Sequence, residues 1–132
     1  MLNDNVGKLL LRLTVALLML FHGWNKLNGG IEWLPGLLQS NGLPGFIAPL
    51  IYVGEVIAPL FIIAGAYTRI AALIVVINML FAIGLVHMGD VFALTGTGAW
   101  AIESQMFYVL NAVVIMLIGP GKYAAMPASK WN

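Results

Sequence analysis

The fold of this chain is decided by residues 13–26, which read LTVALLMLFHGWNK. The first nine of these residues are apolar apart from Thr14, and His22, Asn25 and Lys26 then follow within five positions. A histidine and a lysine that are four positions apart share one face of a helix. The stretch therefore predicts an apolar helix whose polar groups gather at one end.

The composition of the chain places this helix in a lipid bilayer. Of the 132 residues, 61% are hydrophobic and only 8% are charged, whereas a soluble domain usually carries about 25% charged residues. The net charge is +1 and there is no basic run, so nucleic acid is not a predicted partner. The sequence contains no cysteine, which excludes disulfides, iron–sulfur ligation and thiol chemistry by this chain.

Four apolar segments are long enough to cross a bilayer, which takes about 20 helical residues. These segments are residues 6–24, 46–66, 70–88 and 101–118. The longer connections, 25–45 and 89–100, contain the glycine, proline, threonine and polar residues that are typical of loops. The predicted fold is all-α, with residues 1–132 forming one domain, an integral membrane bundle of four transmembrane helices.

The first span also has features of a signal peptide, because Lys8 and Arg12 precede its apolar core. The core, however, runs directly into His22 and Gly23 without a small-residue cleavage site. We therefore expect this helix to be retained.

The positions of the basic residues predict the orientation of the bundle. An even number of spans puts both termini and the turn between the second and third spans on one side. That side holds five of the six Lys and Arg residues: Lys8, Arg12, Arg69, Lys122 and Lys130. Because Lys and Arg collect on the inner side of membrane proteins, both termini are predicted to be cytoplasmic.

Glu55 is the polar residue that the sequence marks out most clearly. It lies about nine residues into the second span, where a carboxylate costs several kcal/mol unless it is paired, hydrated or protonated. Pro59, four residues later, has no N–H, so the carbonyl of Glu55 loses its helical partner and the helix should bend. We expect Glu55 to face the bundle interior within direct or one-water reach of His22 or Lys26, either as a functional carboxylate or as a structural tie.

The remaining polar residues of the spans fall into two groups. The candidates for binding a ligand or relaying protons, all in the outer half, are His22, Lys26, Glu55, His87 and Glu103. The residues expected to have structural roles, with the asparagines bonding across helices, are Arg12, Arg69, Asn78 and Asn111. Asn78 and His87 are nine positions apart, so at about 100° per residue they should face opposite sides of the third span and cannot both point straight at one pocket.

No motif in the sequence identifies a catalytic residue. There is no phosphate-binding glycine loop and no nucleophile–base pair. Two histidines and nearby carboxylates are suitable metal ligands, but no two of them have a compact ligand spacing, and we expect no metal site.

Several short motifs nevertheless occur in a fairly specific order. They are Arg12, GWNK (23–26), GE (54–55), GAYTR (65–69) and GPGKY (119–123). With these motifs the chain resembles the DoxX family of small four-helix bacterial membrane proteins, and the resemblance extends over essentially the whole chain. The resemblance implies a multi-pass protein of the bacterial inner membrane and carries over, by motif position, Arg12, Lys26, Glu55 and Arg69. The chain departs from the family pattern at its end, where residues 122–132 contain no acidic residue.

The resemblance also implies a class of function. DoxX relatives are associated with oxidoreductase systems, including thiosulfate oxidation coupled to quinone and membrane-linked oxidative-stress complexes. The first hypothesis is therefore a small membrane subunit or partner of an oxidoreductase system, with a quinone or proton site near the periplasmic side. The expected partners are lipid, other membrane or peripheral subunits and a quinone, and the chain itself is expected to hold no other cofactor.

Two other functions remain as alternatives. A non-catalytic structural or assembly subunit of a larger membrane complex fits the small size of the chain. A channel or small-solute carrier needs a continuous polar stripe, and the inner half offers little beyond Arg12 and Arg69.

The orientation can be tested by cysteine labelling. A cysteine placed at Asn28 or Thr97 should react with a membrane-impermeant reagent added to the periplasmic side of intact cells, because both positions lie in the loops predicted to face outward. Labelling of both positions from the cytoplasm alone would contradict the predicted orientation.

Overall fold

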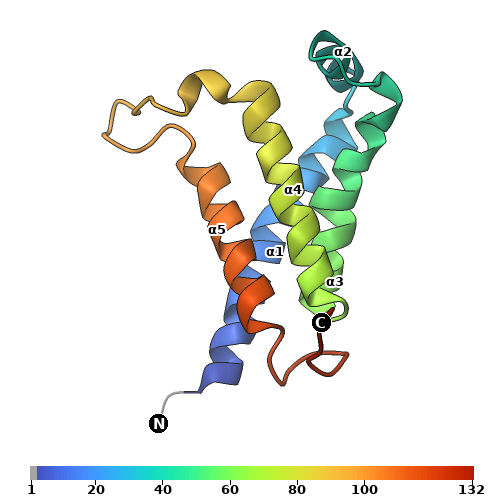
Figure 1. Cartoon of the computed structure of the whole chain (residues 1–132), viewed down its shortest axis with the longest axis vertical. Coiled ribbons are helices and arrows are strands. Elements are labelled where there is room, and N and C mark those ends of the chain that lie inside the picture. The colour runs from blue at the N-terminus through green and yellow to red at the C-terminus, as the bar shows by residue number, and fades with distance from the viewer. Residues whose placement is uncertain (1–2) are drawn as a thin grey trace.

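The structure is a computed structural model that describes residues 3–132 (Figure 1). Within these residues it is helical, and the only β feature is an isolated bridge between Leu94 and Trp100. The longest helices are α1 (Asp4–Gly29), α4 (Thr68–Val86) and α5 (Glu103–Ile118). The second crossing is built from three pieces: the 3-10 helix η1 (Gly45–Leu50), the π-helix η2 (Val53–Ile57) and α3 (Ala58–Ala64). Two short helices lie in the connections, α2 (Trp33–Ser40) and the 3-10 helix η3 (Met88–Asp90).

The all-helical, multi-pass architecture predicted from the sequence is confirmed. Within the described residues, three segments are long and apolar enough to cross a bilayer, namely Asp4–Gly29, Gly45–Ala64 and Thr68–Val86. Helix α5 is apolar but has only 16 residues, so it rises about 24 Å, against a hydrocarbon core of about 30 Å. Helix α1 continues past its predicted end to Gly29, which keeps Lys26 in helical register with His22.

The two ends of the bundle are packed differently. We call the end of the bundle at which both termini lie the inner end and the opposite end the outer end (Figure 1). In the middle and toward the inner end, fully buried alanines such as Ala16, Ala72 and Ala112 let the helices approach closely around Met19 and Ile115. Toward the other end the helices splay apart, and α4 diverges from both α5 and the second crossing (Figure 1). A second cluster of apolar side chains, centred on Leu34, Leu38 and Ala48, fills part of this splayed end.

Arg12 holds the inner end of the bundle together. Its side chain is 1% exposed, and among the described residues it pairs with backbone carbonyls instead of a carboxylate. Nε donates to the Ile62 carbonyl at 3.0 Å and Nη2 to that of Ile63 at 2.9 Å, both in the last turn of α3. Nη1 donates to the carbonyls of Pro120 and Tyr123, at 2.9 and 2.8 Å. The last carbonyls of a helix have no partner within the helix, so Arg12 satisfies α3 and ties it to the segment after α5.

The segment after α5 folds back under the turn between α3 and α4 (Figure 1). The side chain of Asn132 is buried, and its Oδ1 accepts a hydrogen bond from the Thr68 N–H at 2.8 Å, which caps the start of α4. The Ala125 N–H donates to the Ala64 carbonyl at 2.8 Å. Arg69 donates to the Met116 carbonyl at 2.8 Å, near the end of α5. The inner ends of the helices are thereby joined by polar contacts to backbone.

Replacement of Arg12 should therefore destabilise the bundle strongly. Arg12→Met leaves several buried carbonyls without a donor, and we expect a loss of about 3 kcal/mol or more in unfolding free energy. Arg12→Lys should be intermediate, because an ammonium lacks the planar fork of a guanidinium. Thermal unfolding in detergent measures both changes.

The control for this experiment is Lys122→Met, which removes an exposed cation from the same end of the molecule. It should change stability by no more than about 0.5 kcal/mol. An Arg12→Met variant as stable as the Lys122→Met variant would contradict the role assigned to Arg12.

Candidate functional site

The backbone around Glu55 departs from a regular α-helix. Residues Val53–Ile57 form a π-helical turn, in which the Ala58 N–H donates to the Val53 carbonyl five residues earlier. Pro59 lies in the first turn of α3 and has no N–H to offer to Glu55. The π turn shifts the hydrogen bonding by one residue at the place where Pro59 cannot donate. Single π turns of this kind occur frequently at functional sites. The sequence predicted that Pro59 would bend the helix, and the structure shows a π turn at Val53–Ile57, directly before this proline.

Two glycines let three helices converge at the level of Glu55. Gly23 of α1 lies directly against the backbone carbonyl of Glu55, and a Cβ at Gly23 would overlap that oxygen. Gly54 lies against α4, where an added Cβ would come 2.5 Å from the Cβ of Asn78. A larger residue at either position would push the helices apart, so these glycines determine where the second crossing meets α1 and α4.

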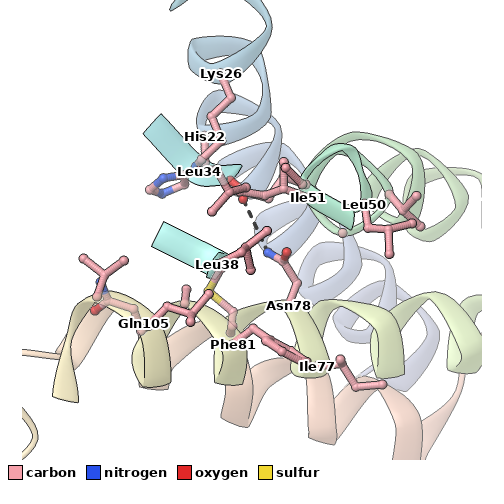
Figure 2. A pocket seen from close by; sticks show the side chains of 18 of the residues that line it. His22, Lys26, Leu34, Leu38, Leu50, Ile51, Ile77, Asn78, Phe81 and Gln105 are labelled. Atoms are coloured by element: carbon pink, nitrogen blue, oxygen red, sulfur yellow. Dashed lines mark hydrogen bonds and ion pairs between the residues drawn. The ribbon is translucent and has the colours of Figure 1, made fainter. Parts of the chain in front are cut away.

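Glu55 is held by two polar side chains from the neighbouring helices. Its side chain is 4% exposed, and its Oε1 pairs with Lys26 Nζ at 2.7 Å. Its Oε2 lies 3.5 Å from Nδ2 of Asn78. Figure 2 shows Lys26 and Asn78 pointing toward each other from opposite sides. The expected contact of Glu55 with the first helix is present, and it is made with Lys26.

The ion pair borders a large, mostly apolar cavity. The cavity has a volume of about 740 Å³ and is lined by residues from α1, α2, the second crossing, α4 and α5. This volume lies within the usual range of about 300–1,000 Å³ for small-molecule sites. The polar groups that face it, in addition to the ion pair and Asn78, are His22, Asn25, His87, Ser104, Gln105 and Tyr108. An apolar chamber with a few convergent polar groups is the usual form of a ligand-binding site.

Helix α2 covers the outer side of this cavity. Leu34 and Leu38 are one helical turn apart, both are buried, and they pack with Ala48 of η1. Figure 2 shows these two leucines among the side chains that line the cavity. The prediction of an irregular loop over residues 25–45 was therefore wrong in this part, because the segment contains an eight-residue helix.

The two histidines lie at the rim of the cavity. His22 is exposed and its ring lies edge-on to that of Tyr108, with 5.6 Å between the centroids. His87 Nε2 lies 3.2 Å from Nε2 of Gln105, and His87 Nδ1 lies 3.5 Å from Oδ2 of Asp90. The argument that Asn78 and His87 cannot face one pocket was wrong, since both line this cavity. Helix α4 ends at Val86, and His87 adopts a non-helical cap conformation to which the helical period does not apply.

Two other polar residues lie differently from the cavity-facing candidates, and the expectation about one of them, Asn111, was wrong. Glu103 is the first residue of α5; it is exposed and lies outside the cavity lining. Asn111 does not bond across helices, because its Nδ2 donates to the Phe107 carbonyl of the same helix at 2.7 Å. Arg12, Arg69 and Asn78 make the contacts described above.

Several residues at the site were not singled out from the sequence. Gln105 and Tyr108 are three positions apart on α5 and face the cavity together. Tyr52 lies one turn before Glu55, and its hydroxyl donates to the Lys26 carbonyl at 3.2 Å. Helical spacing could have identified these residues in the sequence, because polar side chains three or four positions apart share one face of a helix. Among the described residues, no three His, Asp or Glu side chains are grouped closely enough to hold a metal ion.

Comparison with known proteins identifies relatives of the chain. The profile of the DoxX family matches residues 7–88. Inner membrane protein YqjF of Escherichia coli (strain K12) is 27% identical over 121 residues, which cover 92% of this chain and 90% of that protein. No solved structure matches the chain. The matched family region contains Lys26, Glu55 and Asn78, whereas Gln105 and Tyr108 lie outside it.

The coupling of Lys26 to Glu55 can be measured with a double-mutant cycle. Glu55→Ala or Lys26→Ala alone leaves a buried charge without its partner and should cost about 3–5 kcal/mol of stability. The double variant should cost less than the sum of the two. Glu55→Gln, which keeps hydrogen bonds without the charge, should be tolerated better than Glu55→Ala. Thermal unfolding in detergent gives all of these values.

His22 provides the matched control for this cycle. It lies on the same face of α1 as Lys26, one turn away, but Glu55 pairs with Lys26. The effects of Glu55→Ala and His22→Ala should therefore add to within about 0.5 kcal/mol. Strict additivity of Glu55→Ala with Lys26→Ala would instead show that the ion pair contributes no coupling.

Proposed function

The chain belongs to the DoxX family, and from this premise we propose that it binds a quinone-class ligand in the cavity beside Lys26 and Glu55. It acts as a small membrane subunit or partner of an oxidoreductase system in the bacterial inner membrane. The name of the Escherichia coli relative supports this location. The resemblance of the sequence motifs to the family supports the association with redox systems.

The observation that carries this proposal is a buried ion pair at the edge of a large apolar cavity. A quinone has an apolar ring with carbonyl acceptors, and its reduced form has hydroxyl donors. The Lys26 ammonium has donors in addition to the one used by Glu55, and the Glu55 carboxylate has further acceptor positions. The pair can therefore donate to a quinone carbonyl and accept from a quinol hydroxyl without being broken.

The groups at the rim suit the proton side of such chemistry. Reduction of a quinone to a quinol takes up two electrons and two protons. In this proposal a redox partner subunit supplies the electrons, and the chain contributes binding and proton transfer. Histidine side chains commonly relay protons in proteins, and His22 and His87 both line the cavity. They provide a route for protons between Glu55 and the outer surface.

The proposal includes four crossings and an orientation. Helix α5 is the fourth crossing, and both termini face the cytoplasm. Lys8 and Arg12 lie in the first half of α1, Arg69 lies at the start of α4, and Lys122 follows α5. These segments meet at the end of the bundle where Figure 1 shows both termini. The excess of Lys and Arg on cytoplasmic faces supports this assignment. The cavity then opens in the periplasmic half of the membrane.

A structural or assembly subunit is the second candidate. The observation that favours it is the satisfaction of the ion pair within the chain, by Lys26, Glu55 and Asn78. A structural tie, however, does not need a cavity of about 740 Å³ beside it. A channel fits less well, because Met19, Ile62, Val75 and Ile115 pack into a core below the cavity.

Ligand titration tests the proposed function. The purified protein in mild detergent is titrated with a benzoquinone that bears a decyl tail, and binding is followed by thermal shift and by quenching of tryptophan fluorescence, since Trp33 lines the cavity. We expect saturable binding by the wild type. Glu55→Gln should fold but bind about tenfold more weakly, which corresponds to about 1.4 kcal/mol.

Glu103→Gln is the control, because it removes a carboxylate that is exposed and outside the cavity. It should bind as the wild type does. Failure of the wild type to bind any quinone, or equal affinity of the Glu55→Gln variant, would favour the structural role instead.

A further inference from the structure

The cavity exists because α4 and the second crossing meet at one level and separate above it. They are in close contact where Gly54 lies against Asn78. From this point toward the outer end the two helices diverge, as Figure 1 shows. Leu50 of η1 and Ile77 and Phe81 of α4 line the cavity on either side of the resulting gap.

These three residues are also exposed on the outside of the bundle. The exposed fractions are 62% for Leu50, 46% for Ile77 and 50% for Phe81. A residue that lines a cavity and is exposed as well lies at the mouth of that cavity. Both helical segments that carry these residues are long and apolar enough to cross a bilayer, so this mouth faces hydrocarbon and not water.

The rim on the other side of the cavity has a different chemistry. Exposed His22 of α1 and exposed Ser104 of α5, with Gln105, form a polar rim there. Figure 2 shows Leu50 and Ile77 at one end of the view, His22 and Gln105 at the other, and Asn78 between them. A hydrocarbon chain is favoured at the first rim, whereas water and protons are favoured at the second.

We propose that the gap between Leu50, Ile77 and Phe81 is a lateral portal, through which the hydrocarbon tail of a membrane-dissolved ligand enters and in which it stays. This inference rests on the proposed function and specifies its ligand: a lipid-soluble molecule with a compact polar head and a long apolar tail. The head lies beside Lys26 and Glu55, and the tail passes between η1 and α4 into the outer half of the bilayer. Leu34 and Leu38 of α2 cover the outer side, so the ligand arrives from the membrane.

The geometry makes the path from the ion pair to the bilayer short. Asn78 contacts Glu55, and Ile77, the preceding residue of the same helix, is exposed at the mouth. Ile77 and Phe81 are four positions apart and form one continuous edge of the portal. A bulky side chain at Ile77 should therefore obstruct the tail and leave the head-binding groups in place.

The test compares two probes with the same benzoquinone head, one with a methyl and one with a decyl substituent, on protein in lipid nanodiscs. The wild type should bind the decyl probe at least about tenfold more tightly, since burial of a few methylene groups has an effect of this size. Ile77→Trp should remove most of this difference and change the affinity for the methyl probe by less than about twofold.

Leu80→Trp is the matched control, because Leu80 is exposed on the same helix and lies outside the cavity lining. It should retain the wild-type preference for the decyl probe, and this comparison removes the effect of probe partitioning into the bilayer. Leu50→Trp, on the opposite edge, should reproduce the effect of Ile77→Trp and replaces it if that variant does not fold.

The possible outcomes separate the portal from the proposed function. Wild-type binding of both probes with equal affinity would overturn the portal and leave the quinone site intact. The same holds if Ile77→Trp and Leu50→Trp both keep the full preference for the decyl probe. If the wild type binds neither probe, the proposed function itself fails, and the portal fails with it.

Discussion

The structure depends on one constraint, that a carboxylate inside a membrane needs a partner. Glu55 meets this requirement with Lys26 of α1 at 2.7 Å and with Asn78 of α4 at 3.5 Å. These contacts fix the level at which the second crossing meets both neighbouring helices. The π turn and the two glycines, Gly23 and Gly54, let the backbones come close enough for the contacts to form.

The two ends of the bundle serve different purposes. At the inner end, the Arg12 guanidinium and the Asn132 amide satisfy backbone groups at helix termini, and small residues allow close packing. At the outer end, the helices separate around a cavity that α2 covers. Sites that bind ligands need supports that hold their shape, and the firmly joined inner half provides that support for the open outer half.

Each charge of the ion pair has an oppositely charged partner, and each group still has unused hydrogen-bonding positions that are open to a ligand. Pairing and the hydrogen bond from Asn78 lower the cost of keeping two charges in the bilayer. An ammonium has three donors and a carboxylate about four acceptor positions, so both groups retain capacity for a further partner. The mostly apolar walls of the cavity lower the local dielectric constant, which strengthens any additional hydrogen bond that a ligand forms.

The sequence by itself determined that the chain is an all-helical membrane protein, the order of its apolar segments, and the need of Glu55 for a partner on the first helix, because hydropathy and the cost of a buried charge are local properties. It did not determine that the partner is Lys26 and not His22, since both share one helix face. Only the tertiary structure decided this choice, which depends on how α1 is rotated against the π turn. The same holds for α2, a short helix that forms by packing Leu34 and Leu38 onto η1. The cavity, with His87, Gln105 and Tyr108 at its edge and Glu103 outside it, also depends on how the helices splay, and no local pattern encodes the angle between helices that are distant in the chain.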